Sequence, residues 1–193
     1  MRDYTAFLVS KSKSFEIFNL TNLPLIESKK SLTDTQWAWF EYKDLFDIKG
    51  SKTTPLIILQ EYGKGEFPYV TTQAVNNGIE DYFNYYTEEA NVFTVDSAVL
   101  GFCAYQDKNF SASDHVEKLI PKFDNCNIYI AMFITTLINK ERYRYNYGRK
   151  CSQTKMKSSK IKLPIIKTQS GKICPDWQFM EDYIKSLPYS SCL

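Results

Sequence analysis

Short runs of β-branched and aromatic residues, separated by turn residues, fill the middle of the chain. The runs lie at residues 56–59, 69–72, 92–95 and 98–105. The segments between them include Tyr-Gly-Lys-Gly at 62–65 and Asn-Asn-Gly at 76–78. Apolar runs of this length bounded by turn residues are typical of strands joined by hairpins and loops. The pattern therefore predicts a sheet-rich region from residue 46 onward.

Helical periodicity appears only in the second half of the chain. Apolar residues recur at the i, i+3, i+4, i+7, i+8 spacing at Ile130, Phe133, Ile134, Leu137 and Ile138. This spacing places them on one face of a helix, for which Asp124 or Asn125 is the expected N-cap.

Two further elements are expected near the C-terminal end of the sequence. Residues 161–166 read as a strand, and Pro164 indicates that it lies at a sheet edge because proline cannot donate to a ladder. Asp176 is placed to cap a short helix. The apolar face of that helix comprises Trp177, Met180, Tyr183, Ile184 and Leu187.

Composition narrows these elements to one fold class. A chain of 193 residues with 44% apolar and 16% aromatic residues supplies the core of one α+β domain, with a twisted sheet and a few helices. We expect residues 46–187 to form this domain, residues 1–45 to be an N-terminal extension packed on it, and residues 188–193 to be a tail. No apolar stretch is long enough for a signal-peptide core or a membrane span, so we expect a cytoplasmic protein. Five widely spaced cysteines without a CxxC pair predict reduced thiols.

Charge is concentrated in residues 139–162. Nine lysines and arginines stand there against the single acid Glu141, so the tract carries +8 while the chain totals +2 and the remainder carries −6. Tyrosines are interleaved with the cations. Guanidinium and ammonium groups neutralise phosphates, and phenol rings stack on or hydrogen-bond to sugars and phosphates, so the tract suits a nucleic-acid contact. The candidate residues are Arg142, Arg144, Tyr145, Tyr147, Arg149 and Lys150, with Lys155 and Lys157 as further phosphate contacts.

Composition alone leaves other interpretations of this tract open. A run of charges is commonly a solvated face, and Tyr143 could equally face inward as a continuation of the helix core. The tyrosines could also form a stacking platform for single-stranded nucleic acid or RNA. A basic face that binds an acidic protein partner is a third possibility.

Catalytic motifs are not found in the sequence. His115 is the only histidine, which excludes a site with two imidazole ligands, and its setting at residues 113–116 favours a structural role in a loop before a strand. None of the seven glycines follows a GxGxxG or GxxxxGK spacing. We therefore expect a non-catalytic protein without a cofactor or a metal site.

Several segments together resemble one family, the target recognition domain of specificity subunits in type I and related type IIB and IIG restriction-modification systems. The segments are LFDIKG at 45–50, YVTT at 69–72, NNGI at 76–79, DHVEKL at 114–119, YGRK at 147–150, IKLP at 161–164 and PDWQFMEDYI at 175–184. Their order and spacing over residues 46–187 carry the resemblance, to which the first 45 residues add little.

The resemblance implies an α+β domain that reads half of a bipartite duplex DNA target and carries no methyltransferase or nuclease chemistry. Its partners would be double-stranded DNA, the modification (methyltransferase) subunits and the restriction subunits. It also implies that Thr71, Thr72, Gln73 and Asn77 lie at a strand end and loop near the DNA groove, although Asn76 and its neighbours fit a simple tight turn as well. Full specificity subunits carry two such domains separated by long helices, so this chain resembles a single domain, a half subunit or a fragment.

Overall fold

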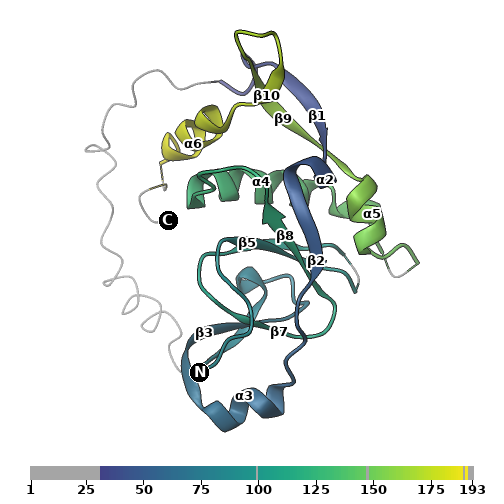
Figure 1. Ribbon diagram of the computed structural model, residues 1–193, viewed down its shortest axis with the longest axis vertical. Helices are drawn as coiled ribbons and strands as arrows, with labels where there is room; N and C mark the ends of the chain where they lie inside the picture. Colours follow the sequence, from purple (N-terminus) through teal and green to yellow (C-terminus); the bar gives the residue numbers. More distant parts are fainter. Residues whose placement is uncertain (1–30, 99, 147, 189, 191–193) are drawn as a thin grey trace, which may run out of the picture.

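One helix packed across a four-stranded antiparallel sheet forms the centre of the structure (Figure 1). The computed structural model describes residues 31–98, 100–146, 148–188 and 190. The sheet has the strand order β2-β8-β5-β6, and the helix is α4. Their bounds are Phe46–Gly50 for β2, Val116–Pro121 for β8, Val92–Asp96 for β5, Cys103–Gln106 for β6 and Ile128–Lys140 for α4.

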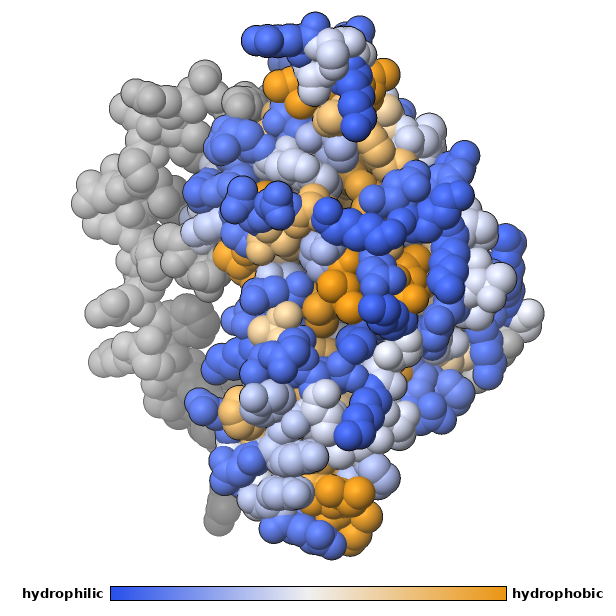
Figure 2. Space-filling model, viewed as in Figure 1, coloured by the Kyte–Doolittle hydropathy of each residue, from blue (hydrophilic) through white to orange (hydrophobic). Residues whose placement is uncertain are grey.

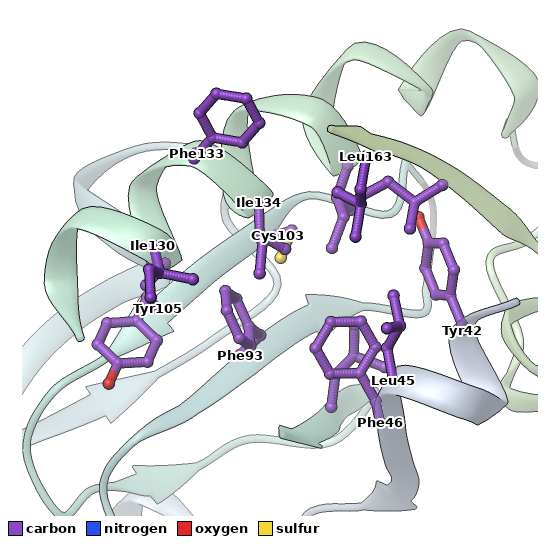
Figure 3. Close-up of a cluster of buried hydrophobic side chains, with 14 of the residues drawn as sticks. Tyr42, Leu45, Phe46, Phe93, Cys103, Tyr105, Ile130, Phe133, Ile134 and Leu163 are labelled. Atoms are coloured by element: carbon purple, nitrogen blue, oxygen red, sulfur yellow. The ribbon is translucent and has the colours of Figure 1, made fainter. Parts of the chain in front are cut away.

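Successive side chains of a strand point to opposite faces, and this sheet has apolar side chains on both faces. Phe93 of β5 and Cys103 and Tyr105 of β6 point toward Ile130 and Ile134 of α4 (Figure 3). The helix buries the face predicted from its spacing, with Leu137 half-buried. Full burial of a side chain of this size stabilises a fold by about 1.5–3 kcal/mol, so the packing of α4 on the sheet contributes substantially to stability.

The predicted cap of α4 was wrong by two residues or more. Asn127 is the N-cap, and its side-chain oxygen accepts from the backbone N–H groups of Tyr129 and Ile130, at 3.1 Å each. Asn125 instead adopts a positive φ of 61° in the preceding turn. Sequence spacing could not choose among three nearby Asp and Asn residues, because each is a favourable cap.

A second sheet lies on the far side of α4, with α6 beside it (Figure 1). It has the order β1-β9-β10, followed by α6: Trp37–Glu41 for β1, Lys160–Lys167 for β9, Ile173–Pro175 for β10 and Trp177–Lys185 for α6. The Asp176 carboxylate accepts from the Phe179 N–H at 2.9 Å, as predicted for the cap of α6.

The expectation that residues 161–166 form an edge strand was wrong, because β9 is the central strand of this sheet. Pro164 is tolerated there because its missing N–H would face β10 at the point where that ladder ends. Its carbonyl still accepts from the Asp176 N–H at 2.9 Å. Proline is therefore compatible with a central strand at the last rung of one ladder.

A third sheet, of order β4-β3-β7, covers the other face of the central sheet and carries α3 at its end (Figure 1). The elements are Ile79–Phe83 for β4, Lys64–Val70 for β3, Ser111–Ala112 for β7 and Leu56–Tyr62 for α3. Val70, Phe110 and Ala112 form a second apolar cluster with Val92 and Val116 of the central sheet.

The apolar run at residues 56–59 is helical, and its prediction as a strand was wrong. Only Leu59 is buried, and the Pro55 carbonyl accepts from the Ile58 N–H at 3.0 Å to begin the turn. Ile57 remains 64% exposed. Figure 2 shows an apolar patch at the bottom of the view, where α3 lies in Figure 1. Four apolar residues fit a buried strand and one helical turn equally well, so tertiary packing decided the outcome.

The remaining described elements are short. They are α2 at Tyr42–Leu45, α5 at Gln153–Ser158, and the 3₁₀ turns η2 at Asn76–Gly78 and η3 at Arg142–Arg144. Within the described residues, no helix is both long enough and apolar enough to cross a bilayer. The α+β fold class is confirmed, and the expected boundaries at residues 45 and 187 stay a prediction, since residues 1–30 lie outside the described part.

Candidate nucleic-acid interface

The basic tract begins where α4 is tied to the edge of the central sheet. The Asn139 side-chain oxygen accepts from the Cys103 N–H at 2.9 Å, and its amide nitrogen donates to the Cys103 carbonyl at 2.8 Å. Both backbone groups face outward from β6, which is the edge strand, so one side chain takes the place of a neighbouring strand. The direction in which the tract leaves α4 is thereby fixed.

The first two arginines of the tract make contacts within the domain. The Arg142 guanidinium lies over the Phe102 ring, 5.2 Å from its centroid, and the side chain is half-buried. Arg144 pairs with Glu141 at 2.6 Å and lies over the Tyr143 ring, but the residue is exposed. Arg142 is therefore mainly a packing residue here, whereas Arg144 keeps a solvent-facing cation.

The tyrosines of the tract are placed in different environments. Tyr145 is half-buried against the main core, and its hydroxyl lies 3.3 Å from the Ser159 hydroxyl. Tyr143 is 76% exposed, so the alternative that it continues the core was wrong. Tyr147 lies outside the described residues.

The later cations are presented by a tight turn and by α5. Backbone bonds between Asn146 and Arg149 close the turn, which leaves Arg149 and Lys150 exposed. Met156 is only 1% exposed and holds α5 to the domain. Lys155, on the same short helix, is half-buried at a cleft. Lys157, one residue beyond Met156, is exposed.

A cleft of about 470 Å³ brings several of these residues together. Its lining consists of four cations, two aromatic rings and two hydroxyl groups: Arg144, Arg149, Lys155, Lys160, Trp39, Tyr145, Ser158 and Ser159. No carboxylate belongs to this lining. Two lining cations pair with acids just outside it, Arg144 with Glu141 at 2.6 Å and Lys160 with Glu41 at 3.7 Å. The cleft therefore has the electrostatic character of an anion site. Lys150 and Lys157 lie outside it.

Four residues of the cleft lining were not among the sequence candidates: Trp39, Ser158, Ser159 and Lys160. Trp39 is 55% exposed on β1, and Lys160 begins β9, the strand that pairs with β1. Trp39 lies in the first 45 residues, where the periodicity was too irregular to predict a strand. The available signal was the pair Trp37 and Trp39 at the i, i+2 spacing of a strand.

The second set of predicted residues lies in the loop that follows β3. The Gly78 carbonyl accepts from the Thr71 N–H at 2.7 Å, and the side-chain amides of Gln73 and Asn76 both donate to the Ile79 carbonyl. Asn77, like Asn76, has a positive φ, of 52°. The tight-turn interpretation of Asn76 is therefore confirmed, and Gln73 uses its amide to close the loop.

Gln106 of β6 anchors this loop to the central sheet. Its side chain is 2% exposed and donates to the Asn77 carbonyl at 3.0 Å and to the Thr94 hydroxyl at 3.1 Å. Thr71 and Thr72 are half-buried at the start of the loop, and the Asn77 residue is exposed at its tip.

The basic tract and the loop at residues 71–77 are both attached to β6, at opposite ends of the strand. Asn139 binds the Cys103 end of β6, and Gln106 at the other end points to the face away from α4. Three residues of a strand span about 10 Å, which separates the two anchor points. The structure therefore gathers Arg144, Tyr145, Arg149 and Lys155 at one cleft, and it places the loop at residues 71–77 across the central sheet from them.

The structure puts His115 in a turn. It has a φ of 62°, its side chain is 56% exposed, and its Nε2 lies 3.3 Å from the Asp114 carboxylate. In the described ranges, no group of three or more His, Cys, Asp or Glu side chains could hold a metal ion.

A cation-lined cleft with aromatic walls on an α+β scaffold is typical of nucleic-acid-binding proteins. Comparison with known families is consistent with this class, because the family model of the type I restriction modification DNA specificity domain matches residues 35–187. The chain belongs to this family. The resemblance stated from the sequence, and with it the prediction of a DNA specificity domain of restriction-modification systems, is confirmed.

Individual relatives agree with this assignment. The chain is 27% identical over 190 residues to the type II restriction enzyme specificity subunit S.BcgI of Heyndrickxia coagulans. The match covers 94% of this chain and 53% of the relative. The chain thus spans about half the length of that curated relative.

Two solved structures share the fold. They are the S subunit of a type I restriction-modification system from M. genitalium and the HsdS subunit from Thermoanaerobacter tengcongensis. The first has a TM-score of 0.50 at 16% identity and covers 70% of this chain and 37% of the other. The second has a TM-score of 0.52 at 10% identity and covers 86% and 39%, respectively.

Proposed function

We propose that this chain binds double-stranded DNA and specifies the target of a restriction-modification system, with the cleft beside α5 as part of its DNA surface. The observation that carries the proposal is the convergence of Arg144, Arg149, Lys155 and Lys160 on one cleft without a lining carboxylate. Each cation that meets a phosphate releases a condensed counterion, which gives favourable and salt-dependent binding.

The proposal assigns two kinds of contact. Arg149, exposed on a tight turn, is placed to reach either a phosphate or a guanine edge, and Lys150, Lys155 and Lys157 are placed to reach phosphates. The loop with Thr71, Thr72, Gln73 and Asn77 would supply hydroxyl and amide contacts from the other side of the central sheet. Tyr145 would form part of the cleft wall, and Arg142, which lies over the Phe102 ring, would hold the tract against the domain.

Partners would supply the chemistry. We propose that the chain is a non-catalytic specificity component, which directs a modification (methyltransferase) subunit and a restriction subunit to DNA in the cytoplasm. Purified chain alone should then neither transfer methyl groups from S-adenosylmethionine nor cut DNA. Methylation or cleavage by the isolated chain would overturn this part of the proposal.

A salt titration tests the binding itself. Labelled duplex and the matching single strand are titrated with protein across a series of salt concentrations. About four to five phosphate contacts on duplex DNA give a log-log slope of about −4. A flat salt response would favour an acidic protein partner, and tighter binding to the single strand would favour a single-strand or RNA module. Either result would reject the duplex assignment.

A further inference from the structure

Trp39 differs from the other two tryptophans of the chain in its surroundings. The Trp37 ring stacks on Phe133 with centroids 6.3 Å apart, and the Trp177 ring stacks on Phe123 at 3.9 Å. Within the described residues, no aromatic ring or cation packs on the Trp39 indole, which is 55% exposed. A single exposed apolar residue is common on protein surfaces, so exposure alone assigns no role.

The position of Trp39 in the structure does indicate a role. Trp39 forms a wall of the cation-lined cleft and lies directly opposite Lys162 in the ladder between β1 and β9. Lys160, two residues along β9, lies opposite Glu41 and pairs with it at 3.7 Å, so Trp39 has lysines on the same face of the sheet at positions 160 and 162. Flat apolar surface next to several cations matches the chemistry of a nucleotide, which offers a sugar or base beside its phosphate.

The volume of the cleft is also compatible with this chemistry. It is about 470 Å³, within the range of small-molecule sites, and the cations stand on η3, the turn at Arg149, α5 and β9. A phosphate held by Arg149 and Lys155 would place the adjoining sugar toward the indole wall.

We propose that Trp39 packs against the sugar-phosphate backbone of bound duplex DNA and thereby extends the interface from the basic tract onto the β1–β9 sheet. This inference rests on the proposed function, because it requires that duplex DNA occupies the cleft. A backbone contact carries no sequence information, so Trp39 is a positioning residue that acts on every duplex alike.

Intrinsic fluorescence gives a direct test. Addition of a short mixed-sequence duplex to the wild-type chain should quench or shift the tryptophan emission, because the exposed indole becomes covered. Trp39→Phe should abolish most of this change while retaining binding, since Trp37 and Trp177 are already stacked within the domain. If duplex changed the emission of Trp39→Phe as much as that of the wild type, the inference would be overturned.

Affinity measurements complete the test. Trp39→Ala should weaken binding to two unrelated duplexes by a similar factor of about ten, which is the scale expected when the burial of one large apolar side chain is lost. Ile166→Ala is the matched control, since Ile166 is an apolar residue of the same sheet with 53% exposure that lies outside the cleft, and it should bind like the wild type. A loss confined to single-stranded DNA would overturn the inference.

The two proposals fail in different ways. If duplex binding is steep in salt but Trp39→Ala binds like the wild type, the contact at Trp39 is wrong and the proposed function stands. If the wild-type chain shows no salt-dependent duplex binding at all, both are wrong.

Discussion

The side chain of Asn139 and the backbone of Cys103 form a closed pair of hydrogen bonds, at 2.9 and 2.8 Å, that joins the end of α4 to the edge of the central sheet. Asn139→Ala would leave both Cys103 groups without these partners. We expect the free energy of unfolding to fall by about 1–3 kcal/mol, measured by urea denaturation, because unpaired backbone groups at a partly buried edge keep their desolvation cost.

Thr136→Ala is the matched control for that experiment. Its hydroxyl bonds only to the Met132 carbonyl within α4 and is exposed, so its loss should change the unfolding free energy by less than about 0.5 kcal/mol. Equal stability of the two variants would show that the Asn139 bonds do not anchor the helix.

Gln106 should control the order of the loop at residues 71–79. Gln106→Leu removes the donor to the Asn77 carbonyl, so we expect faster hydrogen exchange at the Gly78 amide, which bonds to Val75 at 2.9 Å. Gln178→Leu, an exposed glutamine on α6, is the control that should leave this exchange rate unchanged. Unaltered exchange in Gln106→Leu would mean that the loop is held by its own bonds alone.

Arg149 and Lys157 should separate base reading from phosphate binding, once a recognised duplex is identified. Arg149→Ala at a guanine edge should cost about 1–3 kcal/mol on the target and much less on random duplex, as measured by equilibrium titration. Lys157→Ala should weaken both alike and make the salt slope shallower by about one. Equal losses on both duplexes for Arg149→Ala would assign Arg149 to a phosphate.

Cysteine reactivity should report the packing of the main core. Burial raises the pKa of the Cys151 thiol to about 11 and raises that of Cys103 as well, so almost no thiolate exists at pH 8. In native protein, both should resist iodoacetamide, and among the four cysteines in the described part of the chain the half-buried Cys174 of β10 should react first. Peptide mass spectrometry before and after urea unfolding measures this order, and early labelling of Cys151 would contradict the burial of α5 against the domain.

Long periodic segments predicted the fold best. The spacing of α4 and the cap at Asp176 were confirmed, because five apolar positions on one helical face leave little choice of secondary structure. The short run at residues 56–59 was assigned wrongly, since four apolar residues fit either a strand or a helical turn and the burial of Leu59 decided between them. The edge position expected from Pro164 was wrong, because the point at which the ladder to β10 ends is a property of the partner strand.

The candidate site was predictable only in part, for a similar reason. The basic tract is contiguous in sequence, so its cations could be named at once, whereas the cleft also needs Trp39, more than 100 residues away along the chain. Pairing of β1 with β9 creates that proximity, and no local pattern encodes it. The inward contacts of Arg142 and Tyr145 likewise depend on Phe102 and Ser159, which the charge pattern does not reveal.

The anchor between Gln106 and Asn77 is made to a main-chain carbonyl, a group that every amino acid carries. Exchange of the loop side chains therefore leaves the anchor intact, provided that residues 76 and 77 tolerate their positive φ angles. New combinations of side chains at residues 71, 72, 74 and 75 can be displayed on an unchanged scaffold, whereas Gln73 contributes a bond that closes the loop. Such an arrangement permits diversification of the displayed surface without a compensating change in the core.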